Sequence, residues 1–116
     1  MKRSMLIGKI HRACVTGADI NYEGSITVDE TLYKKANILP YERVQVLNIT
    51  NGARAWTYVI PGPADKGDII MNGALARMAE IGDRVIILAY GLMDEEEIKN
   101  HKPRIVVVDE NNHEIN

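Results

Sequence analysis

The chain has 116 residues, a formal net charge of −2 and a single cysteine; 46% of its residues are hydrophobic and 26% are charged. This composition excludes a disordered chain and predicts one globular domain over residues 1–116. The charge and the absence of a long apolar run exclude a general nucleic-acid binder and a membrane helix, so we expect no nucleic-acid or membrane partner. A lone cysteine and no signal-peptide pattern favour a cytoplasmic protein.

The first third of the chain predicts two strands and a helix. Met5–Val15 has an extended pattern with apolar side chains on both faces, as in a strand that is buried on one side and lines a site on the other. Thr16–Asp19 has the composition of a turn, and the β-branched run Ser25–Val28 predicts a short strand. Asp29 is a suitable N-cap for a short helix that ends at Asn37.

A hairpin is predicted in the middle of the chain. Arg43–Ile49 alternates as a strand does, Asn51-Gly52 is a strong signal for a tight turn, and Arg54–Ile60 returns as the partner strand. The prolines that begin at Pro61 are expected to end this strand. Ile69–Met71 then predicts a short buried strand.

The last third predicts a helix over Ala74–Glu80, a strand over Arg84–Tyr90 and a further helical turn that begins at Asp94. Ile105–Val108 predicts the final strand, and the polar tail from Asn111 is expected to fray. Many short strands, few short helices and frequent Gly and Asn turns together predict a small, mostly-β barrel. Periodicity does not choose among barrel topologies.

Four short motifs follow one another in a characteristic order and spacing. They are Gly8–Arg12 (GKIHR), Asn21–Ser25 (NYEGS), Asn48–Tyr58 (NITNGARAWTY) and Asn72–Ala74 (NGA). Each motif alone is an ordinary loop or strand sequence, and a Gly-Ser pair serves any turn. Together they resemble the bacterial aspartate 1-decarboxylases, from the N-terminus to about Gly91. The resemblance implies a small six-stranded double-psi β-barrel with short helices, assembled as a homotetramer with active sites between neighbouring subunits.

The resemblance also implies an activity: a carboxy-lyase that converts L-aspartate to β-alanine and CO2 and so supplies pantothenate and coenzyme A synthesis. Such a precursor cuts itself at a Gly-Ser bond, which here is Gly24–Ser25. The products would be residues 1–24 and residues 25–116, with Ser25 converted to a pyruvoyl group. Gly24 suits this bond because it has no Cβ to block the attacking hydroxyl.

Decarboxylation of an α-amino acid needs an electron sink for the carbanion that remains when CO2 leaves. The sequence has no glycine-rich phosphate loop and no lysine in a recognisable cofactor setting, so we expect no pyridoxal phosphate. A pyruvoyl group derived from Ser25 would take this role by forming a Schiff base with the substrate amine. His101 and His113 have no partners at ligand spacing, so no metal is predicted.

The resemblance assigns five further side chains to the site. Arg54 would bind a substrate carboxylate through its planar, permanently charged guanidinium. Tyr58 would donate a proton to the decarboxylated carbon, since a phenol stays protonated near neutral pH. Thr57 would contact the substrate with its hydroxyl. Lys9 and His11 share one strand face, and two cations there would favour a dicarboxylate. Without the resemblance, each of these is an ordinary strand residue.

Asn72, Gly73, Ala74 and Leu75 would complete the substrate site. An amide side chain and exposed backbone N–H groups at the start of a helix suit an anion or a carbonyl oxygen. The same residues also form an ordinary turn and helix N-cap.

Two positions depart from the family pattern. Asn21 stands where many members have His, and Leu47 stands where some have Trp; both bear on the rate of self-cleavage and on packing around the substrate. Two other interpretations stay open. One is a small barrel that binds a ligand or DNA without chemistry, which the acidic charge balance disfavours. The other is a relative that never cleaves.

Overall fold

Eight strands form one sheet in the computed structural model, which describes all residues from 1 to 116. In chain order the elements are β1 (Arg3–Cys14), β2 (Gly17–Asp19), β3 (Ser25–Asp29), α1 (Glu30–Lys35), β4 (Arg43–Asn48), β5 (Arg54–Gly62), β6 (Ile69–Asn72), the 3-10 helix η1 (Gly73–Met78), β7 (Arg84–Met93), α2 (Glu95–Lys99) and β8 (Arg104–Val107). The prediction of a mostly-β fold with short helices is confirmed.

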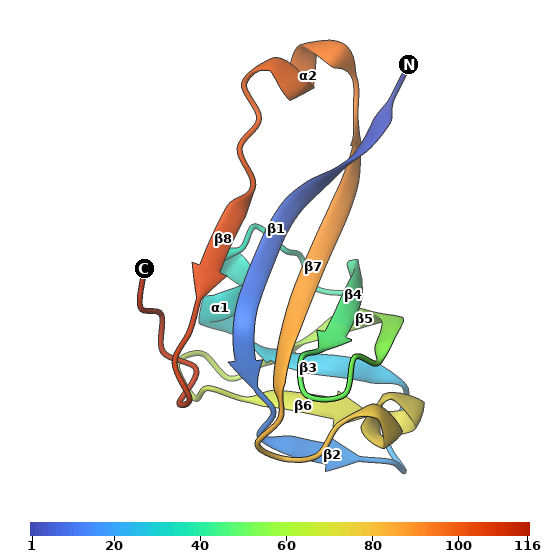
Figure 1. The fold of residues 1–116 in the computed structure, drawn as a ribbon, viewed down its shortest axis with the longest axis vertical. Helices are drawn as coiled ribbons and strands as arrows, with labels where there is room; N and C mark the ends of the chain where they lie inside the picture. Colours follow the sequence, from blue (N-terminus) through green and yellow to red (C-terminus); the bar gives the residue numbers. More distant parts are fainter.

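The strands pair in the order β2-β6-β3-β5-β4-β7-β1-β8, so six strands lie between two short edge strands. β2 has three residues and β8 has four, and the eight observed strands are two more than the six expected. β3 pairs in parallel with β5 and antiparallel with β6. Figure 1 shows β1 and β7 as a long pair that extends beyond the other strands and leads to α2.

The core is built from aliphatic side chains on the inward faces of the strands, since the chain contains no Phe. The largest fully buried side chains are Ile10, Ile26, Ile38, Ile69, Met71, Ile87, Val15, Val28, Val44, Val46, Val59 and Val85. Burial of each side chain of this size contributes about 1.5–3 kcal/mol. Ile26 and Val28 therefore anchor β3, the strand that begins at Ser25, in the centre of the molecule.

The segment Thr16–Asp19 is not the turn that its composition predicts. Its last three residues form β2, and Gly17 lies opposite Ile70 in a parallel ladder with β6. The backbone N–H of Thr16 donates to the Ile69 carbonyl oxygen at 2.8 Å. An available strand edge, formed by residues far along the chain, therefore overrides the local turn signal.

Three further boundaries differ from the prediction. β5 continues through Pro61 because this residue and Gly62 still lie opposite residues of β3. The helix capped by Asp29 is confirmed, but it ends at Lys35. The helix predicted over Ala74–Glu80 is the 3-10 helix η1, which begins and ends earlier in the chain.

The C-terminal tail is not frayed. Asn112 is buried, and its side chain accepts a hydrogen bond from Cys14 N at 2.7 Å. Its Nδ2 group donates to the carbonyl oxygens of Cys14 and Gly67, both at 2.8 Å. Asn116 bonds the backbone of β8 through Val107 N. Side-chain amides of the tail thus bond backbone N–H and C=O groups of the barrel and hold the tail in place. The polar composition of the tail does not predict these bonds.

Candidate active site

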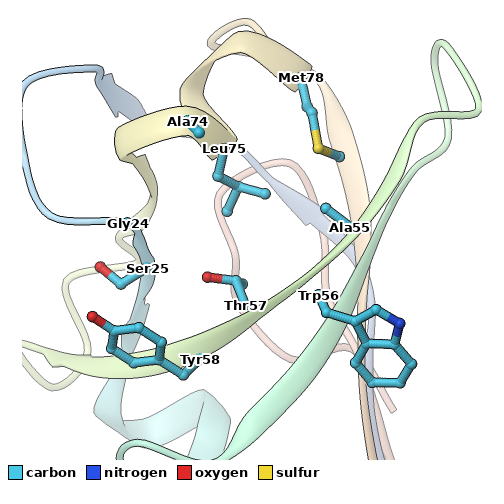
Figure 2. A pocket seen from close by; sticks show the side chains of 9 residues that line it. All are labelled: Gly24, Ser25, Ala55, Trp56, Thr57, Tyr58, Ala74, Leu75 and Met78. Atoms are coloured by element: carbon cyan, nitrogen blue, oxygen red, sulfur yellow. The ribbon is translucent and has the colours of Figure 1, made fainter.

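A cavity of about 370 Å³ opens where β3, β5 and η1 meet. Its lining residues are Gly24, Ser25, Ala55, Trp56, Thr57, Tyr58, Ala74, Leu75 and Met78 (Figure 2). Six of these nine residues are hydrophobic. A polar ligand would therefore be oriented by a small number of polar groups, which is the usual arrangement in a small-molecule site.

Ser25 begins β3 in the wall of this cavity and is only 1% exposed. Its hydroxyl donates to the Glu23 carbonyl oxygen at 3.1 Å and accepts a hydrogen bond from Asn72 Nδ2 at 3.0 Å. The same Nδ2 group donates to Thr27 Oγ1 at 3.0 Å. The Asn72 side chain makes no capping bond to η1. Its amide is directed instead at the hydroxyls of β3.

Gly73 lets the chain before Ser25 pass close to the start of η1. Its φ is +64°, and a Cβ at this position would lie 2.7 Å from Gly24 Cα and 3.0 Å from the Tyr22 carbonyl oxygen. Only glycine tolerates both conditions. A Cβ on Gly24 would meet no atom within 4 Å beyond its chain neighbours. The close approach therefore depends on Gly73.

Thr57 and Tyr58 reach the cavity from β5. Figure 2 shows both of their hydroxyls on the side where Ser25 lies. The Tyr58 ring stacks with the ring of Tyr41, with centroids 6.5 Å apart and an angle of 29° between the planes. This contact restricts the phenol at the edge of the cavity.

Of the predicted site residues, the cavity lining contains Gly24, Ser25, Thr57, Tyr58, Ala74 and Leu75. Three lining residues were not predicted. Ala55 and Trp56 lie between predicted residues of the same motif, so their position on β5 could have indicated them. Met78 ends η1, and no sequence signal marks it.

No positively charged side chain lines the cavity. Arg54 is exposed at the start of β5, opposite Leu47. Lys9 and His11 lie on β1 between β7 and β8, where Lys9 pairs with Leu88. The three basic residues predicted for substrate binding therefore lie outside the cavity of their own chain.

His11 has an unusual environment. Its Nδ1 atom is buried without a hydrogen-bond partner. Burial lowers the pKa of His11 below its ordinary value of 6.5, and the nearby charges of Lys9, Arg12 and Arg84 lower it further. The imidazole is therefore neutral near pH 7. We expect it to act as a neutral hydrogen-bonding group, not as the second cation that the sequence suggested.

No group of three His, Cys, Asp or Glu side chains is placed so that it could hold a metal ion. His101 instead approaches the backbone, with Nε2 2.7 Å from the Leu6 carbonyl oxygen. Neither of the two α-helices, of six and five residues, has the length or the apolar character needed to cross a membrane.

The fold is similar to that of the rationally designed mkDPBB_sym_86 protein, a double-psi β-barrel. The TM-score is 0.50 at 12% sequence identity, and the match covers 68% of this chain and 91% of that chain. The strand arrangement and this likeness define the class of protein as a double-psi β-barrel, which confirms the predicted fold class.

Sequence comparisons then identify the family. The family model for aspartate decarboxylase matches residues 1–115. Aspartate 1-decarboxylase from Thermoanaerobacter pseudethanolicus is 55% identical over 116 residues, which cover 100% of this chain and 99% of that protein. The enzyme from Carboxydothermus hydrogenoformans is 59% identical over 109 residues, covering 94% and 86% of the two chains. The enzyme from Listeria monocytogenes is 53% identical over 113 residues, covering 97% and 89%. The chain belongs to the aspartate decarboxylase family.

Proposed function

We propose that this protein decarboxylates L-aspartate to β-alanine and CO2 with a pyruvoyl group that it makes from its own Ser25. The observation that carries the proposal is the Ser25 hydroxyl, buried and hydrogen-bonded in the wall of the cavity that Tyr58 also lines. Family membership supports the same activity. The β-alanine formed would supply pantothenate synthesis, and a cytoplasmic location fits the free Cys14.

Self-cleavage begins when Ser25 Oγ loses its proton and bonds to the Gly24 carbonyl carbon. The Gly24–Ser25 C–N bond then breaks, the nitrogen takes the proton, and an ester joins the two segments. Loss of the Ser25 Cα proton breaks the Cβ–Oγ bond, which releases Gly24 as a carboxylate and leaves dehydroalanine. Water then replaces the nitrogen, ammonia leaves, and residue 25 becomes a pyruvoyl group. This single cleavage leaves two chains, residues 1–24 and residues 25–116.

The residues present fit a pyruvoyl group at this position. Its carbonyl would supply the electron sink that decarboxylation requires. Tyr58 would hold a proton at its phenol oxygen and deliver it to the substrate carbon that loses CO2. Thr57 would orient the substrate with its hydroxyl, and the Asn72 amide would donate a hydrogen bond to it. Gly73, Ala74 and Leu75 would form the floor of the substrate site at the start of η1.

Aspartate carries two carboxylates, yet the cavity lining contains no cation. An uncompensated anion in a largely apolar cavity is costly, so the positive charge must come from elsewhere. We assign it to Arg54 and Lys9 of a second copy of the chain, in a homotetramer with sites between neighbouring subunits. Neutral His11 of that copy would add a hydrogen bond.

Intact-mass measurement of the purified protein tests the proposal. The wild type is expected to give two species, residues 1–24 and a pyruvoyl-bearing 25–116, and to form β-alanine from L-aspartate. Ser25→Ala is expected to remain one chain of 116 residues without activity. Production of β-alanine by uncleaved Ser25→Ala would overturn the proposed mechanism.

A further inference from the structure

We propose that Thr27 is a positioning residue for self-cleavage, because its hydroxyl fixes the Asn72 amide with an N–H group directed at Ser25 Oγ. The inference rests on the proposed self-cleavage and adds to it a residue that neither the motifs nor the cavity lining indicates.

The side chains of Ser25, Thr27 and Asn72 form a small hydrogen-bonded cluster on two paired strands, β3 and β6. Ser25 and Thr27 are alternate residues of β3, so their side chains lie on the same face. Asn72 ends β6 directly opposite Ser25. Its Nδ2 group donates to both hydroxyl oxygens, each at 3.0 Å. An amide nitrogen has two N–H groups, so both are used and the plane of the amide is fixed.

Thr27 is itself held on its other side. Its Cγ2 methyl lies 3.1 Å from the position that a Cβ on Gly62 would take, so the methyl fills space that glycine leaves on β5. A β-branched side chain has few χ1 states. With the methyl packed against Gly62, the Thr27 oxygen is available to Asn72.

The arrangement has a consequence for the elimination step of self-cleavage. When the Cβ–Oγ bond of Ser25 breaks, Oγ leaves as part of the Gly24 carboxylate and gains negative charge. An N–H donor already in place stabilises that charge without further reorganisation. Without the Thr27 hydroxyl, one N–H of Asn72 loses its partner in a buried site, and the amide is free to turn away from Ser25.

The test measures the rate of chain cleavage. Full-length protein is made by cell-free translation with labelled methionine, and the 25–116 fragment is followed on denaturing gels after synthesis stops. Thr27→Val keeps the shape but removes the acceptor, and we expect cleavage about fivefold to tenfold slower, as for one lost hydrogen bond. Thr27→Ser keeps the acceptor and should stay within about twofold of wild type.

Thr16→Val is the matched control. It removes a hydroxyl that bonds the Ile69 backbone at the opposite end of β6, 3.2 Å from its carbonyl oxygen and 2.9 Å from its nitrogen. It leaves Asn72 and Ser25 untouched. We expect its cleavage rate to equal that of wild type, which separates loss of positioning from general weakening of β6.

A double-mutant cycle shows whether Thr27 acts through Asn72. Asn72→Ala should slow cleavage, and adding Thr27→Val should slow it no further. Equal slowing by Thr27→Val in both backgrounds would overturn the proposal, and so would wild-type cleavage by either single variant. If Thr27→Val does not fold, as judged by circular dichroism, Thr27→Ala takes its place in the same cycle. A wild type that never splits would overturn self-cleavage itself.

Discussion

At the scale of single residues, Asn112 holds the C-terminal segment to the barrel. It satisfies the N–H and carbonyl groups of Cys14 and the carbonyl of Gly67, and it is buried. We expect Asn112→Ala to lower the free energy of unfolding by about 2–4 kcal/mol, because buried backbone groups lose their partners. Urea unfolding monitored by circular dichroism measures this loss. Asn111→Ala, on an exposed neighbour, should change stability by under about 0.5 kcal/mol. Equal effects would contradict the assigned role.

His11 makes stability depend on pH. Its pKa is lowered in the folded protein, first by burial and then by nearby positive charges, so the unfolded chain binds the proton more readily. The contribution of His11 to the free energy of unfolding is therefore fully present above about pH 6.5, and it is lost as the pH falls through the folded pKa of His11. The pKa values of Asp83 and Asp109 are also lowered, but these two carboxylates reduce stability only when the pH falls below about 3.8, so they do not affect the range near neutral pH.

The measurement is the melting temperature at pH 7.5 and at pH 5.5. We expect the decrease between these two conditions to be smaller for His11→Gln than for wild type, because the variant has no half-buried imidazole to protonate. His113→Gln removes an exposed histidine and should keep the wild-type decrease. A decrease that is unchanged in His11→Gln would show that other groups govern this pH range.

The chemistry of individual site residues was more predictable from the sequence than their contacts. Ser25, Thr57 and Tyr58 were singled out by motif, and the structure places them around one cavity. The role of Thr27 was not predictable, because its hydroxyl matters only through a bond to Asn72, 45 residues away. A β-branched residue inside a strand gives no local sign of such a contact.

At the scale of elements, β1 passes against the end of α1 at Gly8. A Cβ on Gly8 would lie 1.7 Å from the Ala36 carbonyl oxygen. Gly8→Ala must therefore push β1 and α1 apart, and we expect a loss of about 3 kcal/mol in unfolding free energy. Gly24→Ala is the control, since its Cβ meets open space. Both are measured by urea unfolding in the uncleaved Ser25→Ala background, and equal stability of the two would refute the close contact.

Elements specified by local sequence were predicted well, and those specified by distant partners were not. The β4–β5 hairpin follows from its alternation and its Asn51-Gly52 turn, and α1 follows from its Asp29 cap. β2 exists only because β6 offers a free edge, and Pro61 remains in β5 only because β3 lies beside it. Hydrophobic periodicity and strand propensity depend only on residues close in the sequence. They therefore cannot show that β6 lies beside β2 or that β3 lies beside Pro61.

At the scale of the whole molecule, none of the predicted basic residues lines the cavity of its own chain. The polypeptide places Arg54 at the exposed start of β5 and Lys9 on β1, while the cavity that contains Ser25 has no cation. The motifs bring these residues together in one sequence pattern, but the folded chain does not place them all in the lining of one cavity. On the proposed function, the positive charge for a dicarboxylate substrate comes from a second copy of the chain.

Subunit complementation tests this shared site. Ser25→Ala lacks the pyruvoyl group and Arg54→Ala lacks the guanidinium, so each variant alone should be inactive or nearly so. When the two are co-expressed, a site is intact if its Ser25 comes from the Arg54→Ala chain and its Arg54 comes from the Ser25→Ala chain. With random mixing, about a quarter of the sites should be intact, because each of the two chains that contribute to a site is the required variant in half of the cases. The mixture should therefore recover about a quarter of wild-type activity per site.

The control for this experiment is Arg54→Ala co-expressed with the double variant Ser25→Ala/Arg54→Ala, in which no site can obtain the guanidinium. It should stay at the activity of Arg54→Ala alone. Native mass spectrometry establishes that mixed assemblies form in both samples. Mixed assemblies of the two single variants without recovered activity would mean that Arg54 serves the cavity of its own chain, and the shared site would have to be abandoned. Recovery would mean that the chain becomes a complete enzyme only by association, because the charge that binds its substrate lies on a neighbour.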